Sequence, residues 1–176
     1  METLKTIVKR KSTRAFSTEK QIARADLDII LAAGCAAPVG MADYASIHLT
    51  VVQSPEFLAK INSTARAAFN LDRDVLYGAP TFVLVSVSEQ QKAPNIHFAN
   101  VGCIVENMLL AATDLGIDSV YLWGASNVIA GNAELCKQIG IPDGFKPASG
   151  AALGYAVENN PGEKELGVTL SINYCE

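Results

Sequence analysis

The sequence predicts a β-sheet covered by helices on both faces, an α/β or α+β architecture. Segments with strand pattern alternate with segments of helical period along the 176 residues, and no internal repeat or long linker interrupts them. Thr81–Val87 is a continuous apolar and β-branched run, which is typical of a central strand buried on both faces. The 49% hydrophobic content suits a large core, and we expect residues 1–176 to form one domain.

The first half of the chain contains three expected helices and one strand. The helices are expected over Thr3–Lys9, Ala25–Ala37 and Pro55–Phe69, and the strand over His48–Gln53. The second helix ends before Pro38 because the residue that precedes a proline disfavours helical geometry. The third begins with proline, which suits the first turn of a helix.

The second half contains the longest expected helix and the remaining strands. Apolar residues from Val101 onward keep the helical period, so we expect a helix over Asn100–Leu115 that ends at Gly116. A short strand over Ser119–Trp123 and a polar helix over Ala133–Ile139 follow. The last strands are expected over Ala148–Val157 and Val168–Ile172.

Composition excludes several classes of protein. The net charge of −4, without a basic stripe, argues against a general nucleic-acid binder, and the longest apolar runs are interrupted by Gly and Pro. The charged N-terminus does not resemble a secretory signal. The four cysteines lie far apart without a CxxC pair, so we expect no metal site and a reduced, cytoplasmic, soluble protein. Cys35 and Cys103 lie in apolar helical patterns and are expected to be buried.

The basic stretch Arg10-Lys11-Ser12-Thr13-Arg14 is the first candidate site. It places three cations and a serine hydroxyl within five residues of an otherwise acidic chain. An arginine fork, a lysine point charge and a hydroxyl donor suit a phosphate ester. The alternative from charge alone is a solvated basic turn on the surface.

Two later stretches, taken with this one in order, resemble the FMN-dependent nitroreductase family. The first is Ala36-Ala37-Pro38-Val39-Gly40-Met41, followed by a strand pattern at His48–Val52. The second is Leu115–Ala125, in which a long helix, a glycine turn, a short strand and Gly124 follow one another. Taken alone, the first could be an ordinary helix-ending turn, and Trp123 in the second could be a core aromatic residue.

The resemblance implies an α+β nitroreductase-like fold, with a mostly antiparallel sheet sandwiched by helices in an interlocked homodimer. FMN would lie at the subunit interface, and NAD(P)H would be the co-substrate. By position, Arg10, Lys11, Ser12 and Arg14 would hold the phosphate, the ribityl chain and the pyrimidine edge of the flavin. Pro38, Val39 and Gly40 would cover the flavin of the partner subunit. Leu122, Trp123 and Gly124 would pass its N5 edge, and Asn70 would face the pyrimidine oxygens.

The resemblance also implies the mechanism. Hydride would pass from NAD(P)H through flavin N5 to an electron-poor acceptor, such as a nitroaromatic or a quinone, in ping-pong order. No catalytic side chain is needed, because the cofactor carries the chemistry. The sequence departs from the family at Val39, where many members have serine, and in its short tail, where Lys164 is the only base. Alternatives are a non-catalytic protein that stores FMN or docks a partner, a specialised enzyme of the same fold, and a domain without flavin.

Overall fold

A four-stranded antiparallel sheet forms the middle of the molecule. The computed structural model describes residues 3–93, 95–158 and 162–176. The strands are β1 (Ile47–Val52), β2 (Thr81–Ser88), β3 (Asp118–Tyr121) and β4 (Phe145–Gly154), in the order β1-β2-β4-β3. Each neighbouring pair is antiparallel. The predicted α+β class, with helices around an antiparallel sheet, is confirmed.

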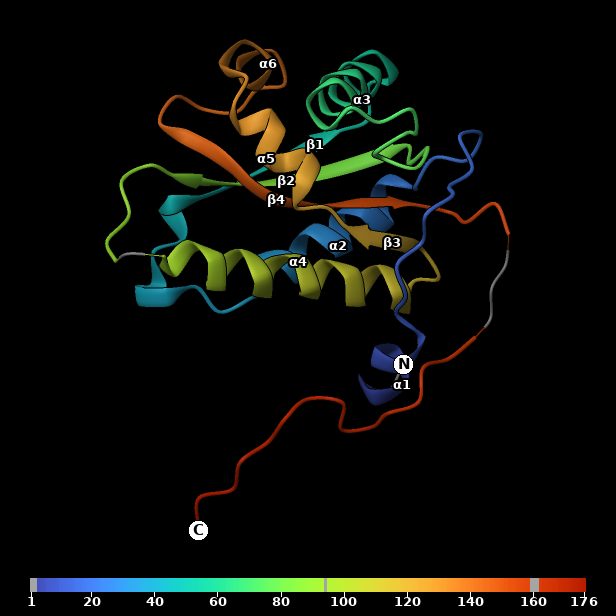
Figure 1. Cartoon of the computed structure of the whole chain (residues 1–176), viewed down its shortest axis with the longest axis vertical. Helices are drawn as coiled ribbons and strands as arrows, with labels where there is room; N and C mark the ends of the chain where they lie inside the picture. The colour runs from blue at the N-terminus through green and yellow to red at the C-terminus, as the bar shows by residue number, and fades with distance from the viewer. Residues whose placement is uncertain (1–2, 94, 159–161) are drawn as a thin grey trace.

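Helices cover both faces of this sheet. They are α1 (Thr3–Lys9), α2 (Arg24–Cys35), α3 (Pro55–Phe69), α4 (Ile96–Asp114), α5 (Gly124–Ala130) and α6 (Ala133–Gln138), with short 3₁₀ turns η1 (Gly40–Ala42) and η2 (Tyr44–Ser46). In Figure 1, α3, α5 and α6 lie above the sheet, whereas α2 and α4 lie below it. The α1 helix lies beyond the end of α4 that is nearer to β3.

The alternation of side chains along β2 produces these layers. Phe82 and Leu84 pack into the cluster beneath α3, α5 and α6, whereas Val83, Val85 and Val87 pack against α2 and α4. Successive side chains of a strand point to opposite faces, so a strand that is apolar throughout must be covered twice. The central position predicted for Thr81–Val87 is therefore confirmed.

The lower layer depends on close contact between α2 and α4. Gly34 has no side chain, and a Cβ atom added there would lie 2.8 Å from Cγ of Met108. In the part of the chain that the structure describes, α4 alone has the length and composition to cross a membrane. Its buried residues face α2 and the sheet, including Ile104, Val105 and Met108, as in the core helix of a folded domain.

Several expected elements differ in the structure, among them the strand expected over Ala148–Val157, which is β4. The α4 helix begins at Ile96, because Asn95 adopts a left-handed φ of 61° and starts the helix before its apolar period is apparent. The strand expected to reach Trp123 ends at Tyr121, and Trp123 has the helical angles that begin α5. Val168–Ile172 is not a strand, and the described residues after Gly154 contain no strand for it to pair with.

The expectation that Cys35 and Cys103 are buried is wrong. Both residues are exposed, although each belongs to a helix with an apolar face. The helical period identifies α2 and α4 as amphipathic, but it does not show that Cys103 is exposed or that Cys35, at the end of α2, borders an open recess.

Candidate functional site

The basic stretch is an extended segment held against strand β3. Ser12 forms a parallel bridge with Ser119, and the backbone N–H of Thr13 donates to the carbonyl oxygen of Ser119 over 3.0 Å. The hydroxyl of Thr13 also donates to Oδ1 of Asp118 over 3.0 Å. These contacts give the segment a defined position on the edge of the sheet, so it is not a solvated turn.

The cations of this stretch divide into two groups. Lys11, Ser12 and Arg14 line a cavity of about 370 Å³, closed on its other side by Ala156, Val157 and Glu158. Among the described residues neither Lys11 nor Arg14 pairs with a carboxylate, and Nη1 of Arg14 lies 3.5 Å from the carbonyl oxygen of Ser12. Their charges are therefore free to meet an anion.

Arg10 lies apart from this cavity, beside helix α4. Its Nε lies 3.4 Å from Oε1 of Glu106, and its side chain is 20% exposed against 50% for the glutamate. Arg10 is thus largely enclosed and is held by this ion pair.

The C-terminal segment brings another cation to Arg10. The backbone N–H of Lys164 donates to the carbonyl oxygen of Val8 over 3.0 Å, and Glu163 lies 3.8 Å from Nζ of Lys9. Burial and the positive charge of Arg10 lower the pKa of Lys164, and Glu106 partly opposes that shift. The fold therefore brings Lys164, the only base of the short tail, to the side of Arg10. Only the fold could reveal this, because Lys164 is far from Arg10 in the sequence.

The far end of β3 carries Trp123, whose side chain is 60% exposed, so it is not a core aromatic residue. Gly124 lies against the ring of Phe69, since an added Cβ there would be 3.4 Å from its Cζ. Asn70 follows Phe69 as the exposed, left-handed cap of α3, so it belongs to the same end of the molecule. Among the described residues the backbone N–H groups of Trp123 and Gly124 have no acceptor, as is usual where a helix begins.

Strand β3 connects these two ends. From Ser119, beside Ser12, to Trp123 the chain advances roughly 13 Å at about 3.3 Å per residue. Leu122 contributes only backbone to this surface, because its side chain is buried and its N–H donates to Gly150 over 2.8 Å. The edge of β3 can therefore accommodate an elongated molecule with an anionic end near the cations.

The loop Pro38–Gly40 lies elsewhere in the same chain. It precedes β1, which forms the opposite edge of the sheet from β3, so one chain does not bring it to the basic stretch (Figure 1). Val39 is 8% exposed and packs in the core, whereas Pro38 is exposed. Gly40 donates its N–H to Oδ1 of the buried Asn100 over 2.9 Å, and Met41 and Ala42 have positive φ values of 59° and 51°.

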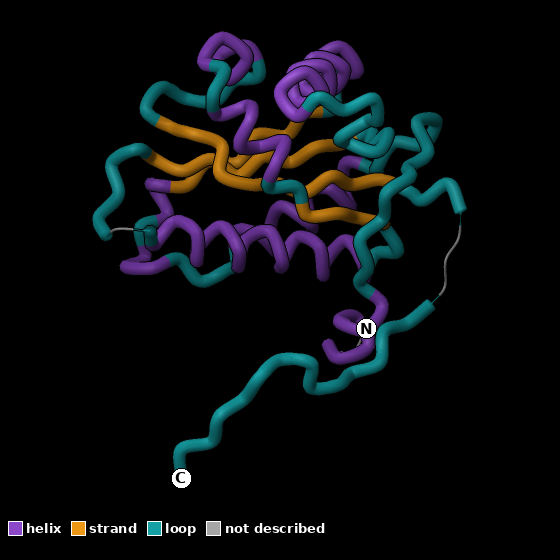
Figure 2. Tube along the Cα trace, viewed as in Figure 1, coloured by secondary structure: helices purple, strands orange, loops and turns teal. Residues whose placement is uncertain are grey.

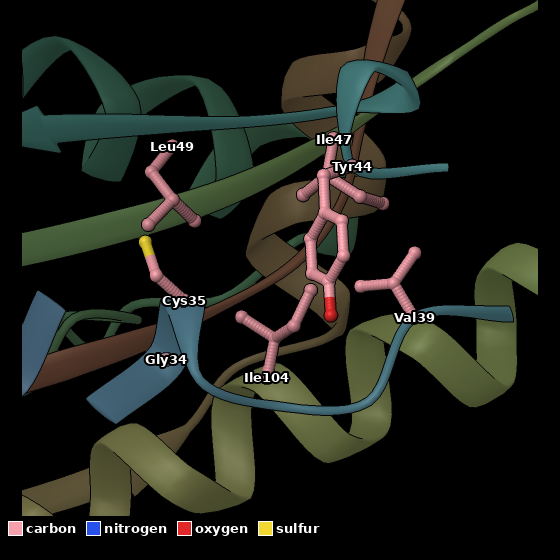
Figure 3. A pocket seen from close by; sticks show the side chains of 7 residues that line it. All are labelled: Gly34, Cys35, Val39, Tyr44, Ile47, Leu49 and Ile104. Carbon is pink, nitrogen blue, oxygen red and sulfur yellow. The ribbon is translucent and has the colours of Figure 1, made fainter. Parts of the chain in front are cut away.

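An apolar recess lies beneath this loop. It has a volume of about 240 Å³, and Figure 3 shows the side chains of Val39, Tyr44 and Ile104 converging on it while Cys35 points toward Leu49. Tyr44 is 53% exposed. The recess opens beside the edge strand β1 and leaves apolar surface uncovered in a single chain.

Asn100→Ala is expected to loosen the Pro38–Gly40 loop. The substitution removes the acceptor of the Gly40 N–H, and a partly buried donor that is left unsatisfied costs up to about 1–3 kcal/mol. Urea unfolding should show that loss, and amide exchange at Gly40 should accelerate. Asn127→Ala, at an exposed position of α5, is the control. Unchanged exchange at Gly40 would contradict this role for Asn100.

Comparisons with known proteins agree with this geometry. The sequence model of the nitroreductase family matches residues 7–155. A protein of Archaeoglobus fulgidus named "Putative NADH dehydrogenase/NAD(P)H nitroreductase" is 31% identical over 155 residues, which are 88% of this chain and 85% of that protein. A crystal structure of a nitroreductase with bound FMN from Bacteroides fragilis has a TM-score of 0.81 and 31% identity, with 100% of both chains covered. Another with bound FMN, from Desulfitobacterium hafniense, has a TM-score of 0.86 and 25% identity over 100% of this chain and 99% of the other.

Proposed function

Since the chain belongs to the nitroreductase family, we propose that it is an FMN-dependent oxidoreductase that uses NAD(P)H to reduce an electron-poor acceptor. Two similar structures contain FMN, and the Archaeoglobus relative is named for NAD(P)H. The observation that carries the proposal is the β3 edge. Arg10, Lys11 and Arg14 gather at one end, and an exposed Trp123 lies at the other, where the N–H groups of Trp123 and Gly124 have no acceptor among the described residues. A nitroaromatic or a quinone is the proposed acceptor.

The residues along this edge suit FMN. Its phosphate carries nearly two negative charges at neutral pH and three strong acceptor oxygens. Arg10 and Lys164 would hold this phosphate, and Lys11 and Ser12 the ribityl chain. Arg14 and Asn70 would face the pyrimidine edge, and the backbone N–H of Trp123 or Gly124 would donate to N5. Each cation would then face a part of FMN that carries negative charge or acceptor oxygens.

We further propose that two copies form each site. Pro38–Gly40 would reach the flavin held by the β3 edge of the other subunit, which explains why one chain separates them. Exposed apolar surface in the recess beside β1, together with the exposed side chains of Val168, Leu170 and Ile172, favours such an assembly. We also propose a single domain over residues 1–176 and a cytoplasmic location.

The chain itself would act by orientation and electrostatics. Bound FMN would supply hydride acceptance at N5 and donation to the second substrate, in ping-pong order. The N–H donor at Trp123 or Gly124 would fix the orientation of N5, and Arg14 would stabilise negative charge on the pyrimidine. Pro38 of the partner subunit would limit the space above the ring, so that a planar acceptor fits after the nicotinamide has left. No side chain of the site needs to form a covalent bond.

The visible spectrum of the purified protein tests this proposal. We expect a yellow protein with flavin absorption that bleaches on anaerobic addition of NADH or NADPH and returns when a nitroaromatic or a quinone is added. A protein that binds FMN but is not bleached would be a storage or docking protein. A colourless protein that does not take up added FMN would exclude both functions.

A further inference from the structure

Glu106 of helix α4 is a carboxylate at the proposed phosphate site. Its Oε1 lies 3.4 Å from Nε of Arg10, and its charge also acts on Lys164, which the C-terminal segment brings to the same place. Half of the Glu106 side chain is exposed, whereas Arg10 is mostly enclosed. A carboxylate beside two cations is unexpected where a phosphate anion should bind, because like charges repel.

The charges of this cluster suit an exchange of anions. Arg10 and Lys164 carry two positive charges, and Glu106 reduces the net charge of the three groups to about one. A phosphate monoester carries roughly 1.5 to 2 negative charges at neutral pH. The charge of the two cations alone would therefore match that of the phosphate. When no phosphate is bound, the two cations repel each other, and this repulsion contributes to the lowered pKa of Lys164. Glu106 relieves that repulsion.

We propose that Glu106 is a counterion that holds Arg10 when no flavin is bound and that the FMN phosphate displaces it. This inference rests on the proposed function. The exchange is possible because Glu106 lies on the solvent side of α4 and can turn outward without disturbing the core. Glu106 thereby sets the affinity for FMN and the preference for FMN over riboflavin, and it stabilises the protein without flavin.

The inference predicts opposite effects of Glu106→Gln on affinity and stability. The variant keeps the size of the side chain and removes its charge, so FMN should bind about twofold to fivefold more tightly, on the scale of a partly exposed charge interaction. Riboflavin lacks the phosphate, and its affinity should not change. The melting temperature of the flavin-depleted protein should fall, because two cations lose their counterion.

Fluorescence titration of flavin-depleted protein with FMN and with riboflavin measures these affinities. Glu134→Gln, on an exposed position of α6 on the other face of the sheet, is the matched control and should leave both unchanged. In an Arg10→Gln background the gain from Glu106→Gln should shrink, since Glu106 acts partly through Arg10.

The outcomes separate this inference from the proposed function. Absence of FMN binding to the unmodified protein would overturn both. FMN binding with the same ratio of FMN to riboflavin affinity in Glu106→Gln would overturn only the inference, as would weaker FMN binding in that variant. Tighter FMN binding together with a lower melting temperature of the flavin-free protein is the supporting result.

Discussion

Replacing Arg10 and Arg14 together by alanine is expected to abolish retention of FMN during purification while the fold remains intact. A hydrogen bond to a charged group contributes about 1.5–3 kcal/mol. Two such contacts correspond to a loss of affinity of roughly a hundredfold to ten-thousandfold. The protein should therefore be colourless after gel filtration, and FMN titration should measure the remaining affinity.

The structure explains why this variant should still fold. Arg14 is exposed, and its single recorded contact is with the carbonyl oxygen of Ser12. Arg10 loses an ion pair with a half-exposed glutamate, and such pairs contribute about 0–1 kcal/mol. The control is the double variant Arg24→Ala and Arg73→Ala, which removes the same amount of charge elsewhere on the surface. The purified control protein should remain yellow. Full flavin occupancy in the Arg10/Arg14 variant would contradict the proposed roles of both residues.

The sequence predicts most of the fold because local and tertiary signals agree. The bounds of α1 and α3 were predicted from the basic stretch that follows one helix and from the proline that opens the other. The central strand β2 is predictable because it is buried on both faces, so its sequence is apolar throughout and does not alternate between apolar and polar residues. Helix α5 was missed because Gly124 resembles the end of a strand, whereas the chain turns into a helix at Trp123.

The candidate site was predictable only in part, because sequence spacing carries no information about which distant residues meet. The motifs identified the basic stretch and the Trp123 end, and pairing of Ser12 with Ser119 joins them. The meeting of Lys164 with Arg10 and Glu106 depends on how the C-terminal segment returns to α1. Val39 and Leu122 are predicted to lie near the flavin, and the structure packs the side chains of both into the core. At those positions the contact with flavin would come mainly from backbone atoms.

The C-terminal segment has the alternating apolar pattern of a strand, but the strand predicted over Val168–Ile172 is absent. Apolar residues recur at every second position from Leu166 to Tyr174, and they are 52% to 81% exposed. The segment is extended away from the body of the chain (Figures 1 and 2). A strand needs a partner for its backbone groups, and an isolated strand in water has none. In a second copy, the edge strand β1 would supply hydrogen-bond partners for the backbone of the segment, and the apolar recess beside β1 would cover its apolar side chains.

Removal of residues 166–176 is therefore expected to convert a dimer into a monomer that has lost its flavin. This truncation keeps Lys164 and its hydrogen bond to Val8, so the cations of the proposed phosphate site remain. Burying a large apolar side chain contributes about 1.5–3 kcal/mol, and losing several should weaken association by at least roughly a thousandfold. Light scattering after gel filtration measures the mass, and absorption at flavin wavelengths measures occupancy.

The alternating pattern allows a sharper version of the same experiment. Serine at Val168, Leu170 and Ile172 removes the apolar face of the segment, whereas alanine at Thr169, Ser171 and Asn173 changes only the opposite face. We expect the first variant to behave like the truncation and the second to remain a yellow dimer. Equal effects of the two variants would mean that the segment acts through its backbone or length. A truncated protein that is still dimeric and fully yellow would show that the proposed two-subunit site does not depend on the C-terminal segment.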